Sequence, residues 1–152
     1  MYVNMRIANM DKLQLLGRWH IVEWVQRYDD GRQVYPLGRS PGGFIQYDSD
    51  RMFCFISGSG RKPLGGSQWT ASDAEKAAAY TSCLVYSGTY EIAGHEILHK
   101  VDLSLYPNWV GTTQRRRAAL RDGRLLLTAR LEEGTPEART AELIWERWSK
   151  QL

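Results

Sequence analysis

The chain has 152 residues, of which 43% are hydrophobic and 11% aromatic, and its formal net charge is +3. This composition excludes a disordered chain, and we expect one domain, 1–152, large enough to bury a sizeable core. The modest charge does not indicate a nucleic-acid partner, and no stretch reaches the roughly 18 apolar residues of a membrane span.

The two cysteines carry no sign of a metal site. Cys54 and Cys83 lie outside any Cys-x-x-Cys or Cys/His cluster, so the sequence predicts no metal. Residues 1–17 lack the continuous apolar segment of a signal peptide. We therefore expect free thiols and a cytoplasmic protein. Whether either thiol is reactive stays open.

Most of the elements predicted along the chain are strands, in which apolar and polar residues alternate between short turns. A helical turn at 11–16 precedes them. Strands are expected at 19–28, 33–35, 43–47 and 51–57 and, beyond a helix, at 86–92, 96–105, 112–120, 124–132 and 140–149. Short antiparallel connections of this kind favour a barrel or a sandwich.

One helix interrupts the strands. Residues 57–69 break every periodicity and predict a loop, a candidate flap over a barrel mouth. Thr70 or Ser72 can cap the helix, and Glu75 follows Ser72 in capping-box spacing. An alanine-rich stretch favours continuing it. We expect this helix near 70–83, across or beside one mouth.

Polar side chains interrupt the apolar face of two middle strands. Alternation places His99 on that face of one strand, and Gln114 and Arg116 on that face of the next. An arginine inside a barrel keeps its charge, so it needs a carboxylate, a water-filled cavity or an anionic ligand group. These residues together predict a wet cavity. The alternative for His99 alone is a core residue bonded only to protein atoms.

Glu23 is a candidate carboxylate partner for Arg116, because it shares the parity of Trp19 in the first long strand. A bulge after Trp19 would instead turn Trp24 inward and Glu23 outward. Both arrangements stay open on the sequence alone.

Several motifs in this order resemble a known family. They are Gly17-Arg18-Trp19 at the start of the first long strand, Tyr35-Pro36-Leu37-Gly38, Gly43–Tyr47, the alanine-rich helix, Tyr86–Glu91, His99, Pro107–Thr112, Gln114, Arg116 and Leu143–Arg147. This succession resembles the lipocalin-like domain proteins of bacteria and fungi over about residues 13–149. The resemblance implies an all-β, up-and-down antiparallel barrel of the lipocalin or calycin type, with about 8–10 strands. It also implies that Arg147 packs across Trp19 and closes one end.

The main functional hypothesis is binding of a small, mostly apolar ligand with a polar or anionic group inside the barrel. The residues expected to contact this ligand are Tyr47, Tyr90, His99, Val101, Leu103, Gln114 and Arg116. We expect a small molecule as the partner, with no cofactor, nucleic acid or membrane, and we leave a homodimer open.

The alternative is a cofactor-free cyclase, isomerase or lyase acting on a natural-product intermediate, as the resemblance allows. In that case His99 would move the proton, Tyr90 would donate a hydrogen bond, and Arg116 would stabilise developing negative charge. A third class, a protein-interaction module, would have a filled barrel and an exposed apolar patch. The sequence alone leaves open whether the protein is an enzyme.

Overall fold

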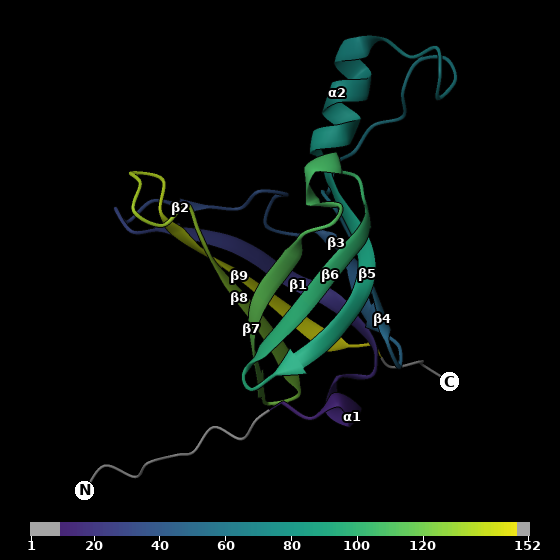
Figure 1. Ribbon diagram of the computed structural model, residues 1–152. Helices are drawn as coiled ribbons and strands as arrows, with labels where there is room; N and C mark the ends of the chain where they lie inside the picture. Colours follow the sequence, from purple (N-terminus) through teal and green to yellow (C-terminus); the bar gives the residue numbers. More distant parts are fainter. Residues whose placement is uncertain (1–9, 149–152) are drawn as a thin grey trace, which may run out of the picture.

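A sheet of nine antiparallel strands closes on itself in the computed structural model, which describes residues 10–148 (Figure 1). Strand β1 pairs with both β3 and β9, which closes a barrel of eight strands, while the short β2 pairs only with β1. The strands are β1 (Gly17–Tyr28), β2 (Gln33–Val34), β3 (Gly42–Tyr47), β4 (Arg51–Ser57), β5 (Cys83–Ala93), β6 (Glu96–Ser104), β7 (Thr113–Arg121), β8 (Arg124–Leu131) and β9 (Arg139–Arg147). The predicted all-β barrel is confirmed. Ser149, the predicted end of the last strand, lies outside the described residues.

In the described part of the chain, two helices and one 3-10 turn accompany the strands: α1 (Lys12–Leu15), α2 (Asp73–Thr81) and η1 (Pro107–Trp109). Ser72 is the N-cap of α2 and forms a capping box with Glu75, which decides between the two predicted caps. The helix has no buried residue and rises away from one end of the barrel (Figure 1). It therefore stands beside that mouth and does not cover it. Within residues 10–148, neither helix has the length and apolar character needed to cross a bilayer.

The opposite end of the barrel is closed by α1, which lies beneath it in Figure 1. The Trp19 indole N–H donates to the Leu15 carbonyl at 2.9 Å, and the ring is almost fully buried. The Arg147 guanidinium lies 4.1 Å from the centre of the Trp19 ring and donates to the Leu16 carbonyl at 2.7 Å. One tryptophan and one arginine thus fasten α1 to the first and last strands of the barrel.

A β-bulge in β1 decides whether Glu23 or Trp24 faces the interior of the barrel. The pairing with β9 shifts between Ile21 and Glu23, so Val22 is an extra residue in the ladder. Beyond it, Trp24 borders the barrel cavity. Glu23 forms no ion pair with Arg116 within the part of the chain that the structure describes. The bulged alternative is therefore the observed one.

A second bulge corrects the predicted facing of β6. Ser87 pairs with Leu103 and Gly88 pairs with Val101, which leaves Asp102 unpaired and reverses the facing of later residues. Leu103 is consequently 66% exposed on the outer surface, so the prediction that it points inward is wrong. A Cβ at Gly88 would lie only 1.9 Å from the Lys100 carbonyl oxygen, which is why this close crossing requires glycine.

Removing the Arg147 guanidinium should loosen the closed end of the barrel. We expect Arg147→Ala to lower the free energy of unfolding by roughly 1–2 kcal/mol, through loss of the cation–π contact and of a charged hydrogen bond. Urea denaturation measures this change. Arg124→Ala is the control, because its exposed pair with Glu146 should contribute less than about 1 kcal/mol. Equal losses in both variants would contradict a special role for Arg147.

Candidate ligand-binding site

The barrel encloses a cavity of about 540 Å³ at the end where α2 and η1 lie. This volume is within the range of roughly 300–1,000 Å³ that is typical of small-molecule sites. Tyr106 and Trp109 border it near η1, and Glu132 and Arg139 border it at the loop between β8 and β9. The cavity is therefore continuous with the mouth that the loops surround.

Differences in side-chain size explain why only one half of the barrel is open. Toward α1 the interior is filled by large buried residues: Trp19, Tyr47, Met52, Ile97, His99 and Leu125. Toward α2 the facing residues on β8 and β9 are Ala129 and Ala141, which pair directly with each other. Their methyl groups leave space that larger side chains would occupy, so the barrel is packed at one end and hollow at the other.

Arg116 brings a positive charge into this hollow half. It lies on β7, borders the cavity, donates to the adjacent Arg115 carbonyl at 2.9 Å, and lies beside the Tyr86 hydroxyl. Within residues 10–148 its guanidinium forms no ion pair with a carboxylate. Gln114, which borders the cavity beside it, donates to the Thr112 hydroxyl at 3.1 Å. The Arg116 guanidinium thus keeps most of its five N–H donors for other acceptors.

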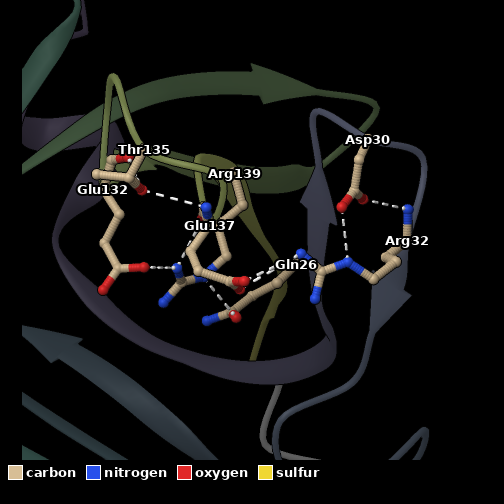
Figure 2. A network of polar contacts seen from close by, with 7 residues as sticks. All are labelled: Gln26, Asp30, Arg32, Glu132, Thr135, Glu137 and Arg139. Carbon is tan, nitrogen blue, oxygen red and sulfur yellow. Dashed lines mark hydrogen bonds and ion pairs between the residues drawn. The ribbon is translucent and has the colours of Figure 1, made fainter.

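The second arginine of the cavity, Arg139, is fully engaged, as Figure 2 shows. Its guanidinium pairs with Glu132 at 2.7 Å, donates to Gln26 at 2.9 Å and donates to the Glu137 carbonyl at 2.9 Å. Glu137 also pairs with Arg32 at 3.3 Å. This network ties the β8–β9 loop to β1 and neutralises the charge of Arg139, in contrast to Arg116.

His99 faces inward as predicted, but it is fully buried and does not border the cavity. Hydrogen bonds join its Nε2 to the Tyr47 hydroxyl at 2.7 Å and its Nδ1 to the Tyr86 hydroxyl at 2.9 Å. Burial, together with the positive charge of Arg116, lowers the pKa of His99 to about 3. The imidazole is neutral near pH 7, and one nitrogen donates while the other accepts.

Tyr86 separates His99 from the cavity. Its side chain borders the cavity, while its hydroxyl holds the imidazole nitrogen. The prediction that His99 contacts ligand is wrong for this geometry, because large neighbours fill the space around the ring. The structure instead matches the alternative in which His99 is a core residue bonded only to protein atoms.

The other predicted contact residues divide in the same way. Gln114 and Arg116 border the cavity, whereas Tyr47, Tyr90 and Val101 are buried in the packed half. Their inward direction follows the alternation, but they do not border the barrel cavity; Tyr90 instead borders a separate surface hollow beside α1. These three are therefore corrected to core residues, and Leu103 lies outside the barrel.

The three residues of the enzyme alternative are not brought together in the cavity. Tyr90 and His99 are cross-strand partners, but the Tyr90 hydroxyl donates to the Asp48 carbonyl. Both nitrogens of His99 are occupied, and its lowered pKa makes it a poor proton carrier near neutral pH. Of these three residues, only Arg116 borders the cavity, so His99 and Tyr90 are not placed to carry out the proposed proton transfer there.

Sequence reasoning missed several residues of the site, chiefly Tyr86, Trp24 and Trp145. Tyr86 shares the parity of Gly88 and Tyr90 on β5, and this parity could have identified it. Trp24 faces inward only because of the bulge in β1. Trp145 shares the parity of Ala141 and Leu143 on β9, and this parity could have identified it.

The surroundings of Cys54 disfavour a reactive thiol. Cys54 borders the cavity, and burial raises the pKa of its thiol to about 12, although the charge of Arg116 acts in the opposite direction. The thiol is therefore protonated and a weak nucleophile. Within residues 10–148, no three His, Cys, Asp or Glu side chains are grouped to hold a metal ion.

Comparison with known proteins agrees with this geometry. The family model described as a lipocalin-like domain matches residues 16–148. The chain belongs to the lipocalin-like domain family. The carrier protein ppsC of Aspergillus oryzae, named for 4'-hydroxy-3'-methoxypropiophenone, is 36% identical over 55 residues, which cover 31% of this chain and 50% of that protein. The chain thus spans about half the length of this curated relative. Membership in the lipocalin-like family supports binding of small molecules in the barrel.

Protonation of His99 should weaken the fold in acid. Its pKa falls from about 6.5 in the unfolded chain to about 3 when folded, so the folded state binds fewer protons between these values. The corresponding stability is present above pH 6.5 and is lost as the pH falls toward 3. We expect a loss of about 2 kcal/mol between pH 7 and pH 5 that His99→Gln does not show.

Urea denaturation at both pH values measures this difference, and the pH dependence is compared rather than the absolute stability. His95→Gln, in the turn between β5 and β6, is the matched control and should behave as the wild type does. An unchanged pH dependence in His99→Gln would show that the imidazole titrates normally in the folded protein.

Proposed function

We propose that this lipocalin-like protein binds a small, mostly apolar molecule in the barrel cavity and holds a polar or anionic oxygen of that molecule at Arg116. The observation that carries the proposal is a guanidinium that has no carboxylate partner among residues 10–148 and lies on the wall of a largely apolar cavity. A charge in such a place is costly unless a ligand group or water receives its hydrogen bonds. Arg139 nearby shows the alternative, a guanidinium neutralised within the protein.

The relative from Aspergillus oryzae supports the same class of ligand. Its name is that of a carrier for an aryl ketone, a flat molecule with several oxygen acceptors. Aromatic residues Trp24, Tyr86, Trp109 and Trp145 on the cavity wall suit such a ring, because aromatic groups pack well against each other. We therefore choose 4'-hydroxy-3'-methoxypropiophenone and a series of aromatic carboxylic acids as probes.

Binding should depend on the guanidinium of Arg116. We expect the wild type to bind at least one of these probes, measured by quenching of tryptophan fluorescence and by thermal shift. Arg116→Ala should weaken binding about tenfold or more, because a hydrogen bond to a charged group contributes about 1.5–3 kcal/mol. Arg116→Lys should lie in between, since it keeps the charge without the fork of donors.

The matched control is Arg117→Ala, an exposed neighbour on the opposite face of β7, which should bind as the wild type does. If the wild type binds none of the probes, or if Arg116→Ala binds acids and ketones equally well, the proposed function fails.

A charge kept for ligand binding should cost stability in the free protein. We expect Arg116→Leu to unfold at a higher urea concentration than the wild type, by about 1 kcal/mol, because leucine suits the apolar wall better. Arg139→Leu should have the opposite effect, since it leaves Glu132 without its partner. A marked loss of stability in Arg116→Leu would mean that Arg116 has a structural role.

A further inference from the structure

Two buried indole N–H groups on the cavity wall have no acceptor among residues 10–148. They belong to Trp24 and Trp145, both of which border the cavity. Trp145 is completely buried. An indole N–H can only donate, and buried donors in folded proteins nearly always have an acceptor. These two therefore indicate an oxygen that the protein does not supply.

The third large buried indole provides an internal comparison. The N–H of Trp19 donates to the Leu15 carbonyl at 2.9 Å, in the packed half of the barrel. Trp19 thus obtains its acceptor from the fold, as structural tryptophans do. The two unpaired indoles are both next to the cavity, where a bound molecule could supply the missing acceptor.

The ladder pairings locate these donors relative to Arg116. The register of β7 and β8 places Arg116 opposite Ala129, and Ala129 pairs with Ala141 on β9. Trp24 pairs with Leu143, two residues further along β9, and Trp145 is two residues beyond that. Two residues of a strand span about 6.6 Å. This is the offset along the strand direction for Trp24, and the offset is twice as large for Trp145. Arg116 and the indoles therefore lie at different depths of the cavity, as donors to opposite ends of one aromatic molecule would.

We propose that the ligand carries two acceptor oxygens at opposite ends of an aromatic skeleton, one held by Arg116 and the other accepting from Trp24 and Trp145. The inference rests on the proposed function and specifies its ligand class: aromatic molecules with a carbonyl, carboxylate or ether oxygen at each end. Between the two polar ends, the ring packs against the aromatic wall, in which Tyr86 and Trp109 form an edge-on pair with centroids 5.3 Å apart.

Three probes that differ by one oxygen test the proposal. They are 4'-methoxypropiophenone, with an acceptor at each end, propiophenone, without the ether oxygen, and 1-methoxy-4-propylbenzene, without the ketone oxygen. Each is titrated against the wild type, Arg116→Ala, Trp24→Phe and Trp145→Phe by isothermal calorimetry. Phenylalanine keeps an aromatic ring and removes the N–H. Thermal unfolding establishes that the variants are folded. If one tryptophan variant does not fold, the other alone tests the proposal.

We expect each tryptophan variant to bind the two-oxygen probe about fivefold more weakly. The tryptophan variants should bind one of the single-oxygen probes as the wild type does, because that probe lacks the oxygen that accepts from the indoles. Arg116→Ala should bind the other single-oxygen probe as the wild type does, because that probe lacks the oxygen held by Arg116. Trp69→Phe, at an exposed site outside the barrel, is the control and should bind all probes as the wild type does.

Other outcomes separate this inference from the proposed function. If the tryptophan variants bind all three probes with the same loss, or with none, the indole N–H groups recognise no oxygen and the inference is overturned, while dependence on Arg116 would leave the proposed function intact. If the wild type binds none of the probes, both are overturned.

Discussion

Pairing of β1 with β9 closes the sheet, and all inward side chains must then share one limited interior. The residues on each strand decide how that space is used. Around His99, large aromatic and aliphatic groups fill it, whereas the facing Ala129 and Ala141 leave it open near the mouth. A single continuous barrel therefore contains a packed half that supplies stability and a hollow half that can receive a molecule.

The two arginines that border the cavity differ in their partners. Arg139 bonds to Glu132, Gln26 and a main-chain carbonyl, so its charge is used to hold the β8–β9 loop against β1 at the mouth. Among residues 10–148, Arg116 has no carboxylate partner, and its charge instead helps to lower the pKa of the buried His99. Among residues 10–148, the buried indole N–H groups of Trp24 and Trp145 also have no acceptor. Such a donor costs about 1–3 kcal/mol, so retaining both at the cavity suits a site that is completed by a ligand.

The sequence predicted the strands, the turns and the barrel well, because alternation and turn residues are local properties of the chain. It also placed Arg116 and Gln114 correctly toward the interior. It failed for Leu103, because the bulge opposite Gly88 depends on the approach of a neighbouring strand. It failed for His99 in another way: parity gives the direction of a side chain, but the volume left around it depends on residues from several distant strands.

A crystal structure of the protein with an aryl ketone bound tests the central claim, that the hollow half is a ligand site organised by Arg116. The account predicts a ligand oxygen within about 3.2 Å of the Arg116 guanidinium. It also predicts that His99 keeps its hydrogen bonds to Tyr47 and Tyr86. A ligand bound outside the barrel, or one inside it that leaves Arg116 without contact, would contradict the account.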